Sequence, residues 1–170
     1  ILVVESDPYY IKRVKVVDAG NSAGRIIFID NQNYNNGIQL NQINGPESDL
    51  PVTFIFSALK PVVLTGTITG NVRMFFAGDF QFGMGTETVA YNGLTMFMSN
   101  GDMNICGSIW SDKNNPGGGF LSSDKDITIV ESASFKGQIQ CRGNFKTSGL
   151  IQFNDSVLKA PGFTVPKGMK

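Results

Sequence analysis

The second half of the chain repeats one short pattern. Each copy has a glycine, a stretch of alternating apolar residues, a turn ending in Asp or Asn, and a second alternating stretch. The turn residues Asp79, Asp102, Asp126 and Asn144 follow one another at intervals of 23, 24 and 18 residues. An inexact recurrence at this interval is typical of chains that fold as stacked coils. The copies are GNVRMFFAGDFQF from Gly70, GLTMFMSNGDMNI from Gly93, GSIWS…SSDKDITI from Gly107 and GQIQCRGNFKTSG from Gly137.

The local pattern predicts β-strands. Short alternating segments separated by Gly-Asp or Gly-Asn turns are typical of strands, and no stretch keeps a 3.6-residue apolar period for three turns. We therefore expect almost no helix. The favoured fold is an all-β solenoid of stacked coils, and the alternative is an antiparallel β-sandwich whose turns look alike. Against the sandwich, residues 70–155 contain no Asn-Gly hairpin with matching flanks.

Stacked coils also predict which side chains form the core. Every second strand residue should point inward and lie on its counterpart one coil away. Asn104 and Thr128 take the opposite, outward phase. The expected apolar ladders contain Phe80, Phe82, Met103, Ile105, Ile127, Ile129 and Phe145.

The chain divides into three expected parts. Residues 1–65 form an N-terminal β flank or cap, residues 66–160 the solenoid, and residues 161–170 a C-terminal tail. In the first part, RIIFID (25–30) is a continuous apolar run, which predicts a strand buried on both faces. The polar, Asn-rich segment 31–49 is expected to be mostly loop. Segment 112–122 interrupts the third copy, and its proline and three consecutive glycines predict an outward loop.

Composition excludes several classes of function. Lys and Arg together balance Asp and Glu at 14 each, so no net charge attracts nucleic acid. The most apolar window, residues 50–64, is cut by Pro51, Lys60 and Pro61, so no membrane span is predicted. The chain begins at Ile1 in strand-like sequence, from which we infer a processed chain or a fragment.

Catalysis is not expected, and no catalytic residue or cofactor is predicted. The chain has no histidine, which excludes a Ser-His-Asp mechanism and leaves a zinc site short of ligands. Asp79, Asp102 and Asp126 are weak candidates for Ca²⁺ ligands along one corner of the stack. The favoured interpretation is that each makes its own Asx turn, because stacked carboxylates would repel one another.

The segment around residues 110–120 is the candidate binding site. Trp110 and Phe120 flank a loop whose residues Lys113, Asn114 and Asn115 could contact a protein or a surface glycan. The alternative is that the aromatic rings fill the core. Cys106 and Cys141 are the only cysteines, and a disulfide between them is possible if the protein is exported.

Residues 66–160 resemble the β-solenoid portions of some minor pilins and pilus-assembly proteins of type IV pili. The resemblance rests on loose Gly-x-Ile and Gly-Asp/Asn copies and on GLIQFNDSVLKAPGF (149–163). SFKGQIQCRGNF resembles bactofilins, cytoskeletal polymers built from a short β-helix. The apolar helix with which pilins begin is not part of this sequence, and truncation would account for that. The coils are longer and less regular than those of bactofilins.

These resemblances imply a function but transfer no functional residue. They imply a non-enzymatic structural or adhesive protein of an extracellular or cell-surface assembly. Its partners would be protein subunits of that assembly or a surface glycan, with no nucleic acid. The alternatives are a bactofilin-like polymer joined end to end through uncapped coils, and a polysaccharide-active β-helix enzyme.

Overall fold

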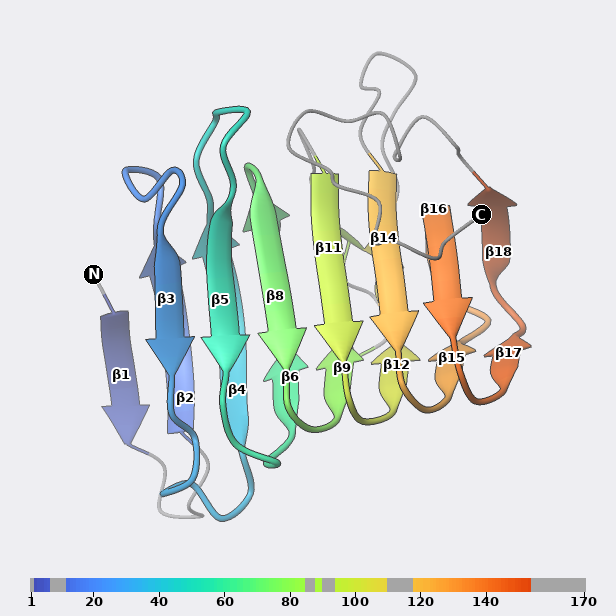
Figure 1. Ribbon diagram of the computed structural model, residues 1–170, viewed down its shortest axis with the longest axis horizontal. Coiled ribbons are helices and arrows are strands. Elements are labelled where there is room, and N and C mark those ends of the chain that lie inside the picture. The colour runs from blue at the N-terminus through green and yellow to red at the C-terminus, as the bar shows by residue number, and fades with distance from the viewer. Residues whose placement is uncertain (1, 7–11, 85–87, 90–93, 110–117, 154–170) are drawn as a thin grey trace.

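The described part of the chain is built from β-strands and turns. The structure is a computed structural model that describes residues 2–6, 12–84, 88–89, 94–109 and 118–153. No helix occurs among these residues, which confirms the all-β prediction (Figure 1).

The strands form two sheets, here called sheet A and sheet B. All adjacent strands are parallel except β1 and β2, so the antiparallel sandwich is wrong. In sheet A the order is β1 (Leu2–Ser6), β2 (Lys12–Asp18), β4 (Ile38–Asn44), β6 (Val62–Leu64), β9 (Phe80–Phe82), β12 (Met103–Ile105), β15 (Ile127–Ile129) and β17 (Phe145–Thr147), with β7 (Ile68–Thr69) also paired with β4. In sheet B it is β10 (Thr88–Val89), β13 (Ser108–Ile109), β16 (Ser134–Cys141), β14 (Gly118–Ser123), β11 (Leu94–Ser99), β8 (Val72–Phe76), β5 (Val52–Phe56) and β3 (Ile26–Ile29), with β18 (Leu150–Phe153) also paired with β16.

The chain passes back and forth between the two sheets. After each long strand of sheet B it makes a short turn and enters a strand of sheet A, as from β8 to β9, β11 to β12 and β14 to β15. Figure 1 shows these sheet B strands running downward in front and the sheet A strands running upward behind them. Equivalent strands of successive passages therefore lie side by side and in parallel.

The core lies between the sheets and consists of columns of in-register side chains. In sheet A one column contains Ile38, Val62, Phe80, Met103, Ile127 and Phe145, and the next contains Leu40, Leu64, Phe82, Ile105 and Ile129. All of these side chains are buried except Phe145, which is 40% exposed. The predicted ladders are thus confirmed, apart from the burial of Phe145, whose strand is the last of its sheet.

Aromatic rings from both sheets meet at the centre of this core. The ring centroids of Phe76 and Phe80 are 4.0 Å apart, and those of Phe80 and Phe97 are 4.8 Å apart. Offset stacks and tilted pairs of this kind add to the free energy that their buried area already contributes. The phenylalanines therefore join sheet A to sheet B.

The prediction of a mostly loop segment at 31–49 is wrong for β4. Its residues Ile38, Leu40 and Ile43 are buried, while Gln39 and Asn41 are not. The strand pairs with β2 and β6, so its backbone is satisfied on both sides. Alternation of apolar and polar residues decided the structure here, although the composition is that of a loop.

Both sheets continue without interruption across the expected domain boundary at residues 65 and 66. Strand β4 pairs with β6 and β7, and β6 pairs with β9. Residues 161–170 lie outside the described part of the chain.

The expected loop at 112–122 is wrong in its second half, because residues 118–123 form β14. Gly119 pairs with Gly137, so the third copy of the repeat aligns on this strand and not on Gly107. A Cβ on Gly119 would lie 2.7 Å from the ring of Phe135, which is fully buried. The glycine is a strand residue that leaves room for a large neighbouring ring.

Candidate functional site

The repeated aspartates bond from one coil to the next. The backbone N–H of Asp102 donates to Asp79 Oδ1 (2.9 Å), that of Asp126 to Asp102 Oδ1 (3.2 Å) and that of Asn144 to Asp126 Oδ1 (2.8 Å). This corrects the expected Asx turns, because each carboxylate accepts an amide of the following coil. Among the described residues no group of three or more His, Cys, Asp or Glu side chains could hold a metal ion.

Among the described aspartates, Asp126 has the most donors around it. The N–H of Asn144, then its side-chain amide and Lys146, lower the pKa of Asp126 below its ordinary value. The Nζ of Lys146 lies 3.6 Å from Asp126 Oδ2. Hydrogen bonds to the charged form stabilise it, so the carboxylate stays ionised and acts as a structural acceptor.

Buried hydroxyls form a second column beside the aspartates. Ser99 Oγ donates to Gly78 O (2.7 Å) and accepts from the N–H of Gly101 (2.9 Å). Ser123 repeats this one coil on, donating to Gly101 O (2.7 Å) and accepting from the N–H of Lys125 (2.9 Å). These polar side chains close turns and join neighbouring coils, which leaves them unavailable to a ligand.

Four of the five predicted binding residues lie outside the described part of the chain. Trp110, Lys113, Asn114 and Asn115 lie outside the described residues. Phe120 lies in β14 and is 3% exposed. Its ring therefore offers no open face on which a sugar could stack.

Cys106 and Cys141 are not joined in a disulfide. Cys106 follows the upward strand β12 of sheet A, whereas Cys141 ends the downward strand β16 of sheet B (Figure 1). The disulfide considered from the sequence is not formed in this structure.

The outward face of sheet A is mostly polar. Its central column, one residue out of phase with the core, runs in register through β4, β6, β9, β12, β15 and β17. Its members are Gln39, Val63, Gln81, Asn104, Thr128 and Lys146. Such a face is well solvated and offers little area for apolar contact.

The outward face of sheet B carries an apolar column, here called the outer ladder: Phe28, Ile55, Phe75 and Met98. These four side chains pair in register across β3, β5, β8 and β11. Phe28 is 72% exposed, and Ile26 beside it is also exposed. The prediction that RIIFID is buried on both faces is therefore wrong, because only Ile27 and Ile29 pack against the core.

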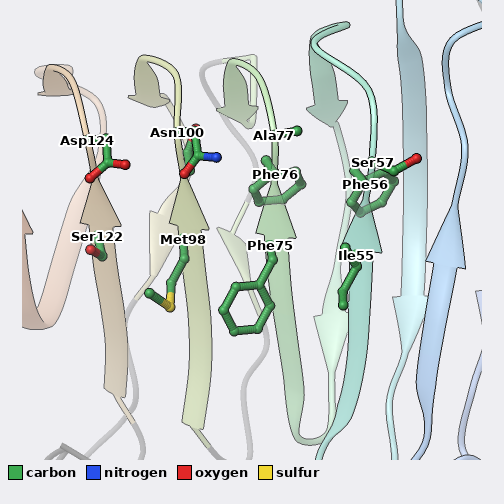
Figure 2. A pocket seen from close by; sticks show the side chains of 11 residues that line it. Ile55, Phe56, Ser57, Phe75, Phe76, Ala77, Met98, Asn100, Ser122 and Asp124 are labelled. Atoms are coloured by element: carbon green, nitrogen blue, oxygen red, sulfur yellow. The ribbon is translucent and has the colours of Figure 1, made fainter. Parts of the chain in front are cut away.

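A shallow groove of about 280 Å³ lies along the outer ladder. Figure 2 shows Ile55, Phe75 and Met98 from three neighbouring strands, with Asn100 and Asp124 at the ends of their strands. The groove is lined by Ile55, Phe56, Ser57, Phe75, Phe76, Ala77, Met98, Ser99, Asn100, Ser122 and Asp124.

The chemistry of the groove favours binding. Asp124 is the one acidic or basic side chain among the described residues that line it, and its Oδ1 lies 3.3 Å from Arg142 Nε. General acid–base catalysis of glycoside hydrolysis uses a pair of carboxylates, and the described residues that line the groove include one, Asp124. An open groove with an apolar floor is suited to contact with a macromolecule.

The sequence carries a signal for this apolar outward face. In β3, β5, β8 and β11 the residues IIFI, VTFIF, VRMFF and LTMFMS place apolar side chains on both phases of the strand. Such strands are either covered on both faces or expose an apolar face to a partner. Only the structure shows which of these holds.

The chain matches no protein-family model, and searches of curated proteins and of solved structures also return no match. The described part of the chain contains no helical segment that could span a bilayer.

Proposed function

We propose that this chain is a β-solenoid that serves as a non-enzymatic structural or adhesive module of a cell-surface assembly. In this proposal the outer ladder binds another protein subunit. The single observation that carries it is the in-register apolar column Phe28, Ile55, Phe75 and Met98 on the solvent side of sheet B.

The support for coils comes from the path of the chain. Successive passages through β8 and β9, β11 and β12, and β14 and β15 repeat the same turn, and their strands pair in parallel with equivalent residues in register. A stack of this kind presents long, regular faces, which is how solenoid proteins form extended binding surfaces.

A protein partner fits the groove better than a glycan does. The floor consists of Ile55, Phe75 and Met98. These side chains offer apolar contact area and the polarisable sulfur of Met98, but no hydrogen-bond donor. Aromatic residues and methionine are enriched where proteins meet, while sugar recognition needs polar side chains along the floor. The polar rim residues Ser57 and Asn100 match the usual arrangement of an apolar centre with a polar edge.

Photo-crosslinking from position 75 in cells that make the protein tests this proposal. A photoreactive phenylalanine analogue at Phe75 should crosslink one defined protein, and Ile55→Ser should abolish that product. The matched control places the analogue at Gln81 on the outward face of sheet A, where no such product is expected. Equal products from both faces, or none from position 75, would contradict the proposal.

A second candidate is an end-to-end polymer, which the C-terminal end of the stack favours. Phe145 and Phe153 occupy the inward phase of β17 and β18 and are 40% and 67% exposed. Their strands are the last of their sheets in sequence order. Exposed strand edges with an apolar core surface are prone to strand addition by another chain.

Light scattering across a concentration series, with electron microscopy of the same samples, tests the polymer. Filaments that lengthen with concentration and are lost in Phe153→Lys would support it. Phe28→Lys, on the outer ladder, is the control that should leave them intact. A wild-type protein that stays monomeric at all concentrations would exclude this candidate.

A further inference from the structure

Four Asn-Gly steps occur in the chain, and the structure describes three of them: Asn36-Gly37, Asn44-Gly45 and Asn100-Gly101. Asparagine before glycine is chemically labile, because glycine has no side chain to shield its amide nitrogen. That nitrogen attacks the side-chain Cγ of asparagine and ammonia leaves. Water then opens the succinimide ring to aspartate or isoaspartate. Each step is thus a potential modification site.

In all three steps the attacking nitrogen is already engaged. The N–H of Gly37 donates to Tyr34 O (3.0 Å), and that of Gly45 donates to Thr69 O (2.7 Å). The N–H of Gly101 donates to the hydroxyl of Ser99 (2.9 Å). All three glycines are buried, so their amides have no access to water. Ring closure requires each of these hydrogen bonds to open first.

We propose that the native fold protects its Asn-Gly steps from deamidation, and that at Asn100 this protection depends on one side chain, Ser99. The acceptors for Gly37 and Gly45 are backbone carbonyls, which no substitution removes. For Gly101 the acceptor is a buried hydroxyl, oriented by its own donation to Gly78 O in the preceding coil. Protection of Asn100 is therefore coupled to the stacking of the coils.

Loss of this protection would change the charge of the groove. Asn100 and Asp124 both line it, and they take equivalent places one coil apart because Ser99 pairs with Ser123 (Figure 2). Deamidation would replace the neutral amide with a second carboxylate beside Asp124. The inference does not depend on the function proposed above, since it concerns the chemistry of the turn itself.

The first test uses the unmodified protein. Samples are incubated at neutral pH, native or unfolded in urea, and peptides containing Asn36, Asn44 and Asn100 are followed by mass spectrometry. We expect each step to deamidate at least about tenfold more slowly in the native protein, because the reactive form is the locally opened one. Equal rates at Asn100 in the two samples would overturn the inference, and this comparison needs no variant to fold.

The second test assigns the role of Ser99. In folded Ser99→Ala, deamidation at Asn100 should rise about tenfold, which corresponds to about 1.4 kcal/mol in the opening of this turn. The rate at Asn44 should not change. The matched control is Ser123→Ala, which removes the equivalent hydroxyl one coil on but keeps the bond between Gly101 and Ser99. If both variants accelerate Asn100 equally, general loosening is the cause and the specific role of Ser99 is wrong.

Discussion

The middle and the C-terminal end of the stack contain equivalent residues in different surroundings. Met103, Ile127 and Phe145 occupy one column of sheet A, yet the first two are fully buried and Phe145 is 40% exposed. Their local sequences are alike, each following an Asp or Asn turn. An inward phase therefore buries a side chain in this column only when another coil lies on each side of it.

The largest effect is expected at the middle of the stack. Ile105→Ala and Ile129→Ala should each lower the free energy of unfolding by roughly 2–5 kcal/mol, the range for a buried aliphatic side chain. Phe145→Ala, at the end, should cost less than either, although it removes a larger side chain. Urea melts of the three variants measure this. If Phe145→Ala lowered the free energy of unfolding as much as Ile129→Ala does, the C-terminal end of the stack would have to be covered.

A smaller effect is expected in the hydroxyl column. Ser123→Ala leaves the buried Gly101 O without its donor and should cost about 1–3 kcal/mol. Cys141→Ala should cost less, because the sulfur lies 3.6 Å from Gly143 O at an exposed place near the end. Thermal melts of both variants test the comparison, with Ser122→Ala on the outward face as the control. Equal losses in Ser123→Ala and Cys141→Ala would contradict it.

The pH dependence of stability should come from Asp126. Its carboxylate accepts a hydrogen bond from Asn144 and so connects the coil of β15 to the last coil. The pKa of Asp126 is lowered in the folded state, chiefly by the N–H of Asn144. A depressed folded pKa contributes stability above the unfolded pKa, and this contribution is lost as pH falls through the folded value. Urea melts between about pH 5 and pH 2 should therefore show a smaller decline in Asp126→Asn than in the wild type. If stability fell equally in both proteins as the pH was lowered, other titratable groups would control its pH dependence.

The smallest effect is expected on the outward face of sheet A. Asn104→Ala and Thr128→Ala should each change the free energy of unfolding by no more than about half a kcal/mol, as is usual for surface positions. They sit one residue before Ile105 and Ile129, so the contrast tests the phase of the strand. If the outward substitutions were the damaging ones, the inward assignment would be wrong.

Much of the fold could be predicted from the sequence, but the candidate site could not. The alternation around Ile105 and Ile129 identified the inward phase, because that period is a local property of the strand. Strand β14 was missed because its glycines contribute no alternation of apolar and polar side chains. At Gly119 the ring of Phe135 leaves no room for a Cβ. The outer ladder was missed because nothing local distinguishes the exposed Phe28 from a buried phenylalanine.

The sequence was enough to identify the strand period and the positions of the Asp and Asn turns, since backbone geometry and neighbouring residues set both. Which apolar phase is covered depends instead on the tertiary packing. In β3 the four residues IIFI are apolar on both sides, yet Ile27 and Ile29 pack on the core while Ile26 and Phe28 face outward. Burial depends on which other segment lies against a face, and that segment is distant in sequence.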